Sequence, residues 1–143
     1  MILLDVNVLV HAHREDAERH EEFGAWMESA LLHPTGIAVS DLVLSGFLRV
    51  VTHPKIFKKP TPPALAFAFI EDLRSRSEVH ILNPSPAHWE IFVDIARKVE
   101  ARGNLLPDAY HAALAIETGC EWITTDRGFA RFPGLRWRHP LDS

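Results

Sequence analysis

Short apolar runs alternate with longer stretches of helical periodicity, and this alternation is what most constrains the fold. We expect β-strands at residues 1–4, 37–39, 79–82 and 121–125, and a last short strand around residues 135–138. Strands separated by helices are typical of an α/β fold with a mainly parallel central sheet flanked by helices. In such a sheet, functional groups collect outside the carboxyl ends of the strands.

The stretches between these runs carry apolar residues three and four positions apart, which predicts amphipathic helices. They centre on residues 23–31, 44–51, 66–73 and 89–99, and a further helix spans residues 106–117. Trp89 begins the apolar face of the fourth of these helices and is expected in the core. Ser40 and Ser85 are expected as N-caps, and Gly119 as the C-terminal stop of the last helix. Residues 6–22 are expected to lead from the first strand into a polar stretch.

The composition is that of an ordinary globular protein, with 143 residues, 47% of them hydrophobic and 24% charged. This length predicts one domain covering residues 1–143. The net charge of −4 provides no overall basic field, so any contact with nucleic acid must be local or helped by metal ions. Cys120 is the only cysteine, no signal peptide is recognisable, and no apolar run is long enough to cross a membrane. We therefore expect a cytoplasmic protein.

Three aspartates occupy positions where chemistry is expected. Asp5 and Asp126 each follow a predicted strand, and Asp108 lies in the first turn of a helix, after Pro107. If that helix begins at the same edge of the sheet, the three carboxylates meet. Carboxylates forced together raise one another's pKa unless a cation compensates, and oxygen ligands suit Mg²⁺ or Mn²⁺. The alternative is that each acid only caps a helix or a turn, as Asp126 does readily before Arg127-Gly128.

Three motifs carry a resemblance to a known family. They are Leu4-Asp5-Val6-Asn7-Val8-Leu9-Val10, then Pro107-Asp108-Ala109-Tyr110-His111-Ala112-Ala113, then Thr124-Thr125-Asp126-Arg127-Gly128-Phe129. In this order, and in a chain of this length, they resemble the PIN-domain ribonucleases of the VapC toxin type. The segment from Ser45 to Pro54 resembles one branch of these toxins in particular.

The resemblance implies a function and a set of roles. Asp5 and Asp108 carry over as ligands of Mg²⁺ or Mn²⁺, and Asp126 as a further catalytic acid. The expected reaction is hydrolysis of RNA phosphodiester bonds, and the expected partners are RNA, a VapB-type antitoxin and a second copy of the chain.

One position departs from the family. Most PIN domains place a glutamate on the helix after the second strand, and here Gly46 stands in its place. Asp41 and Glu117 are the possible substitutes. A catalytically degenerate module that binds RNA or antitoxin without cleavage is therefore the alternative to an active nuclease. Gly46 also needs a structural reason, because glycine within a helix is about 1 kcal/mol less favourable than alanine.

Other enzyme classes fit less well. A phosphatase of the haloacid dehalogenase kind requires an acid two residues after the first aspartate, where this chain has Asn7, and a receiver domain requires a lysine beyond Lys98. Asn7 and Thr125 are candidates to hydrogen-bond the carboxylates, or are ordinary turn residues. His11 and His13 make a weak metal site, and His111 is expected on the helix surface rather than as a base. The candidates for phosphate contacts are Lys55, Lys58, Lys59, Arg127, Arg131, Arg136 and Arg138.

Overall fold

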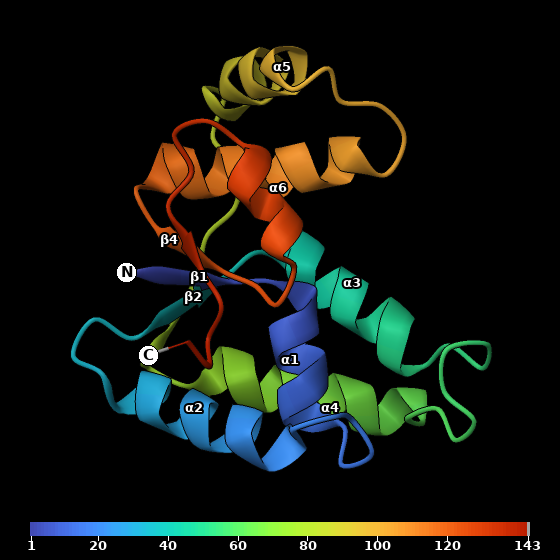
Figure 1. Ribbon diagram of the computed structural model, residues 1–143. Helices are drawn as coiled ribbons and strands as arrows, with labels where there is room; N and C mark the ends of the chain where they lie inside the picture. Colours follow the sequence, from blue (N-terminus) through green and yellow to red (C-terminus); the bar gives the residue numbers. More distant parts are fainter. Residues whose placement is uncertain (143) are drawn as a thin grey trace.

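A five-stranded parallel sheet organises the computed structural model, which describes residues 1–142 (Figure 1). The strand order is β3-β2-β1-β4-β5, and every neighbouring pair is parallel. The strands are β1 (Ile2–Leu4), β2 (Ile37–Val39), β3 (Val79–Ile81), β4 (Glu121–Ile123) and β5 (Trp137–Arg138). The α/β class and all the expected strands are confirmed, each within a few residues of its expected bounds.

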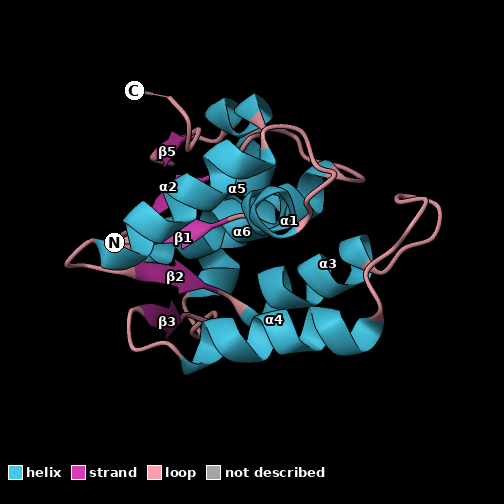
Figure 2. Cartoon of the chain, turned by 90° about the horizontal axis from the view of Figure 1, so that it is seen from below, coloured by secondary structure: helices cyan, strands magenta, loops and turns pink. Residues whose placement is uncertain are grey.

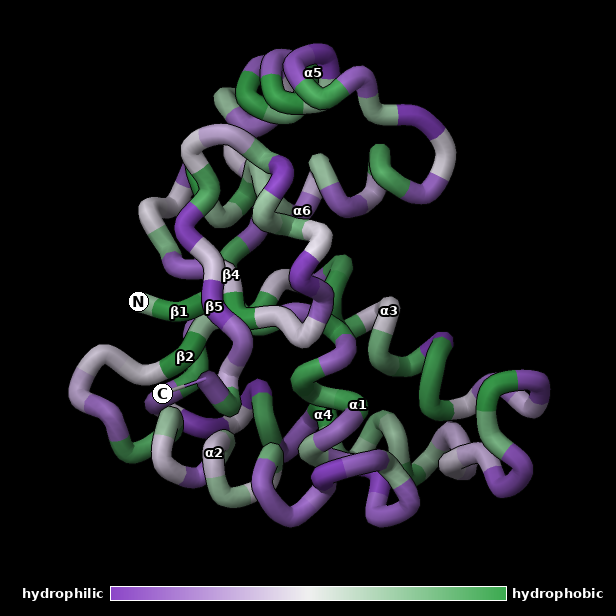
Figure 3. Tube along the Cα trace, viewed as in Figure 1, coloured by the Kyte–Doolittle hydropathy of each residue, from purple (hydrophilic) through white to green (hydrophobic). Residues whose placement is uncertain are grey.

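Within residues 1–142, six α-helices and one 3₁₀-helix surround the sheet. They are α1 (Val6–His13), α2 (His20–Leu32), α3 (Asp41–Val51), α4 (Pro63–Ser75), α5 (His88–Lys98), α6 (Leu105–Thr118) and the 3₁₀-helix η1 (Arg127–Arg131). Figure 1 shows α5 and α6 on one side of the sheet and α2 and α4 on the other, while Figure 2 shows β1, β2 and β3 lying side by side. Figure 3 shows hydrophobic residues concentrated on β1, β2 and α3, and hydrophilic ones on the turn between α1 and α2. No helix within residues 1–142 is long and apolar enough to span a membrane.

Helix α1 is the α-helix that the sequence pattern did not predict, and the short η1 was expected only as a turn. Its residues Val8, Leu9 and Val10 form a continuous buried run, which conceals the helical period in the sequence. Asp5 begins it, in an extended conformation and with its side chain accepting a hydrogen bond from the Val6 N–H. The first catalytic candidate is therefore also an N-cap.

Two helix boundaries were predicted correctly and one was wrong. Ser40 caps α3 by accepting a hydrogen bond from the Val43 N–H at 3.1 Å, and Gly119 ends α6 with a φ of 72°. The prediction that Ser85 caps α5 was wrong, because α5 begins three residues later at His88. The Ser85 hydroxyl donates a hydrogen bond to Glu117 of α6 and accepts one from the Ala87 N–H at 3.2 Å, in the turn before the helix.

Close packing between α1 and α3 explains Gly46. A Cβ at this position would lie 2.9 Å from Val6 Cγ2, a distance at which either the Val6 side chain or one of the two helices has to shift. Trp122, fully buried on β4, belongs to the central core. By contrast, Trp89 is 63% exposed, so its expected place in the core was wrong.

Candidate metal centre

The three aspartates identified from the sequence line one pocket of about 290 Å³. Asp5 follows β1, Asp126 follows β4 and begins η1, and Asp108 lies in the first turn of α6. The start of α6 thus faces the carboxyl ends of the adjacent strands β1 and β4, and this arrangement brings the three carboxylates to the same pocket. The pocket is completed by Val6, Asn7, Val10, His11, Val50 and Phe129.

The carboxylate of Asp5 is only 8% exposed and is held on both oxygens. Its Oδ1 accepts a hydrogen bond from the Val6 N–H at 2.6 Å. Its Oδ2 accepts from the Thr124 hydroxyl at 2.7 Å and from the Asn7 side-chain amide at 3.2 Å. An ionised carboxylate offers about four acceptor sites, so roughly one remains for another partner.

Thr124 connects the ends of β1 and β4. Its fully buried hydroxyl donates to Asp5 and accepts from the Asp126 backbone N–H at 3.0 Å and from the Asn7 amide at 3.2 Å. The Asn7 Oδ1 in turn accepts from the Thr125 N–H at 3.1 Å. Asn7 therefore has the supporting contacts expected of it. For the threonine the prediction named the wrong neighbour, because the hydroxyl that reaches the carboxylate belongs to Thr124 and not to Thr125.

Burial and mutual repulsion make Asp5 and Asp108 weaker acids than usual. The pKa of Asp5 is raised from 3.8 to about 6, mainly because the carboxyl group is desolvated. The charges of Asp108 and Asp126 contribute to this increase, whereas the hydrogen bonds from Thr124 and Val6 oppose it. The pKa of Asp108 is also raised, first by desolvation and then by Asp126, while Arg131 lowers it. A bound cation would remove this penalty by compensating the negative charge.

The donor set fits a hard cation that retains water. All three acids offer oxygen, the ligand type that Mg²⁺ and Mn²⁺ prefer. Within residues 1–142, no three His, Cys, Asp or Glu side chains lie close enough together to hold a metal ion by themselves. Asp5 and Asp108 could hold an ion only with water or substrate oxygens in its remaining positions, which is the usual way in which Mg²⁺ binds to proteins.

The wall formed by α3 carries no acid. Val50 lines the pocket, and Gly46 lies one turn earlier in the same helix, against Val6. Neither Asp41 nor Glu117, the possible substitutes for the missing glutamate, lines the pocket. Asp41 is paired with Arg74 at 2.8 Å and with Asn83 at 3.0 Å, and Glu117 is hydrogen-bonded to Ser85.

The histidines are held by other contacts. His11 lines the pocket, but its Nδ1 is 3.0 Å from the Glu18 carbonyl and its ring stacks on Phe23. His13 is instead 3.2 Å from the Thr61 hydroxyl. His111 was expected on the helix surface and is instead largely buried, with its ring stacked on Trp122; burial lowers its pKa to about 4.

The basic candidates for phosphate contacts are dispersed. Arg131 is the one whose charge acts on Asp108. Arg127 is paired with Asp142 at 3.0 Å, and Arg136 and Arg138 line a pocket with Met1 and Gly36, which flank the amino ends of β1 and β2.

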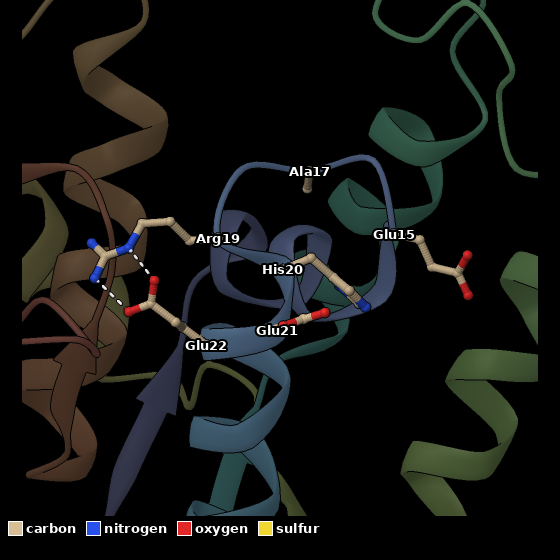
Figure 4. A pocket seen from close by; sticks show the side chains of 6 residues that line it. All are labelled: Glu15, Ala17, Arg19, His20, Glu21 and Glu22. Atoms are coloured by element: carbon tan, nitrogen blue, oxygen red, sulfur yellow. Dashed lines mark hydrogen bonds and ion pairs between the residues drawn. The ribbon is translucent and has the colours of Figure 1, made fainter.

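A larger pocket of about 630 Å³ lies at the turn between α1 and α2. Figure 4 shows that its acids do not converge, since Glu22 pairs with Arg19 while Glu15 points away.

Fold and site together define an α/β domain with a candidate carboxylate metal site, and comparison with known proteins identifies its family. The PIN domain family model matches residues 2–135. The VapC ribonuclease Mb2897 of Mycobacterium bovis is 42% identical over 142 residues, which cover 99% of this chain and 97% of the relative. Ribonuclease VapC31 of Mycobacterium tuberculosis is 38% identical, with 98% and 99% covered. The chain belongs to the VapC ribonucleases of the PIN domain family.

Solved structures share the fold at lower identity. VapBC2 from Rickettsia felis, bound to a promoter DNA fragment, superposes with a TM-score of 0.72 at 22% identity, covering 97% of this chain and 98% of the other. VapC20 from Mycobacterium tuberculosis, a toxin that cleaves the sarcin-ricin loop, has a TM-score of 0.69 at 18% identity, covering 95% of this chain and 99% of the other.

Proposed function

We propose that this protein is a Mg²⁺- or Mn²⁺-dependent endoribonuclease that acts as the toxin of a toxin–antitoxin pair. The observation that carries the proposal is the convergence of Asp5, Asp108 and Asp126 on one pocket, from three separate elements. Membership of the VapC ribonucleases supplies the substrate class.

In this proposal the residues of the pocket have different roles. Asp5 and Asp108 hold the cation, which when bound acidifies a coordinated water and offsets charge on the phosphate. Thr124 and Asn7 keep Asp5 oriented through the hydrogen bonds to its Oδ2. Asp126 has Oδ1 occupied by the Gly128 N–H at 2.8 Å, and its other oxygen is available to orient the attacking water. The water oxygen forms a bond to phosphorus in line with the ester bond that breaks, and the departing ribose oxygen takes up a proton.

The proposed partners follow from the family. A VapB-type antitoxin would silence the enzyme, and several solved structures that share the fold are VapBC or toxin–antitoxin complexes. We also propose a homodimer of single-domain chains spanning residues 1–143, acting in the cytoplasm.

A catalytically degenerate binding module is the second candidate, and the absence of an acid at Gly46 favours it. The two candidates differ in one experiment. A panel of structured RNAs is incubated with the protein in Mg²⁺, in Mn²⁺ or in EDTA, and new chain ends are mapped. The proposal predicts cuts that require the metal and that stop when the cognate antitoxin is added. Binding of RNA without metal-dependent cuts would support the degenerate module.

A further inference from the structure

We propose that this pocket binds one divalent cation, not two, in the absence of RNA, and that Gly46 of α3 sets this limit. The inference rests on the proposed function, because it concerns the metal site of the same pocket. It follows from three features of the pocket: the α3 wall, the free acceptors on the carboxylates and the charge.

The α3 wall offers no ligand and no room for one. Gly46 and Val50 lie on the same helical face, and Val50 lines the pocket. A Cβ at residue 46 would already be 2.9 Å from Val6 Cγ2, so a carboxylate on that Cβ is excluded while Val6 keeps its place. Any second cation would have to be held from the β1, β4 and α6 sides alone.

The carboxylates on those sides have few acceptors left. Two catalytic cations lie about 3.5–4 Å apart and are joined by shared oxygen ligands. Asp5 has three of its acceptor positions taken by Val6, Asn7 and Thr124, and thus has about one to give. Asp126 has one oxygen engaged by the Gly128 N–H. A carboxylate in the position of Asp5 can bind one ion but cannot bridge two.

The charge of the pocket leads to the same number. One divalent cation, together with the nearby Arg131, offsets the three carboxylates that line the pocket. A second cation would leave the pocket positively charged, and charge of one sign is unfavourable at short range unless an anion enters. The phosphates of RNA supply such an anion, so the second ion is expected only together with the substrate.

The test counts Mn²⁺ ions bound to the full-length apo-protein, by electron paramagnetic resonance of free Mn²⁺ at pH 8. We expect one equivalent for the wild type. Two equivalents would overturn the inference and leave the proposed function standing. No binding would overturn both, so the two failures are distinguishable.

A pair of variants tests the part played by Gly46. The Gly46→Glu change is combined with Val6→Ala, which removes the methyl groups nearest to residue 46. We expect the double variant to bind a second equivalent of Mn²⁺, while Val6→Ala alone binds one. Urea unfolding shows whether each variant is folded. A folded double variant that still binds only one ion would refute the assignment to Gly46, whereas the wild-type count tests the stoichiometry without any variant.

Discussion

Replacing Thr124 by valine removes one hydroxyl from a site where it has three partners. The hydroxyl donates to the Asp5 carboxylate at 2.7 Å and accepts from Asp126 and Asn7 at 3.0 and 3.2 Å. Valine has nearly the same shape, so burial and packing change little at this fully buried position. A hydrogen bond to a charged group is worth about 1.5–3 kcal/mol, and a donor left unpaired adds to the loss. We expect Thr124→Val to lower the free energy of unfolding by about 2–3 kcal/mol.

The assay is urea unfolding in EDTA at pH 8, where Asp5 is ionised. Thr125→Val is the matched control, because the structure shows no hydrogen bond of the Thr125 side chain within residues 1–142, and the residue is only half-buried. The control should stay within about 0.5 kcal/mol of the wild type. Since the Thr124 hydrogen bond lowers the pKa of Asp5, Thr124→Val should also raise that pKa. A Thr124→Val protein as stable as the control, with the pKa of Asp5 unchanged, would refute this account of the network.

Three further predictions concern pH and backbone conformation. Because the pKa of Asp5 is about 6, protons compete with the cation, and Mn²⁺ affinity measured by calorimetry should fall about tenfold from pH 7 to pH 5; an affinity independent of pH would contradict this. The pKa of His111 is lowered to about 4, so the unfolded chain binds the extra proton between pH 6.5 and 4 and stability falls as the pH falls. Relative to His111→Phe, the wild type should lose about 3 kcal/mol more between pH 7 and pH 4, whereas parallel pH profiles would disprove the assignment. Gly36→Ala should destabilise the protein far more than Gly119→Ala. Both glycines have a positive φ, but only at residue 36 would the new Cβ clash with a backbone atom, the Glu78 carbonyl oxygen at 2.2 Å. Equal thermal midpoints for the two variants would show that this clash has no effect.

Much of the fold was predictable because its strands are short apolar runs separated by amphipathic helices. Helix α1 was missed because Val8, Leu9 and Val10 are all buried, which removes the periodicity on which helix prediction depends. The misplaced cap at Ser85 has a tertiary cause, because its hydroxyl is engaged by Glu117 from another helix. Periodicity placed Trp89 on the apolar face of α5, yet its side chain is largely exposed.

The site was predictable to the level of residues but not of contacts. Asp5 and Asp126 could be placed at one edge of the sheet from strand ends alone, whereas the position of Asp108 depended on how α6 packs. Thr124 and Thr125 cannot be told apart by composition, since which of two adjacent threonines points inward is decided by the strand register. The reason for Gly46, a contact with Val6 of another helix, is not visible in sequence spacing at all.

Metal-dependent RNA cleavage by the carboxylate pocket is tested by comparing the wild type with two aspartate variants. Cleavage of a panel of structured RNAs in Mg²⁺ or Mn²⁺ is measured for the wild type, Asp108→Asn and Asp94→Asn, the last being an exposed acid of α5 paired with Lys98 at 2.8 Å. The account predicts that Asp94→Asn cuts like the wild type, and that Asp108→Asn is slower by roughly 100-fold or more, since the metal supplies several kcal/mol of transition-state stabilisation. An Asp108→Asn protein that cuts as fast as the wild type would contradict it.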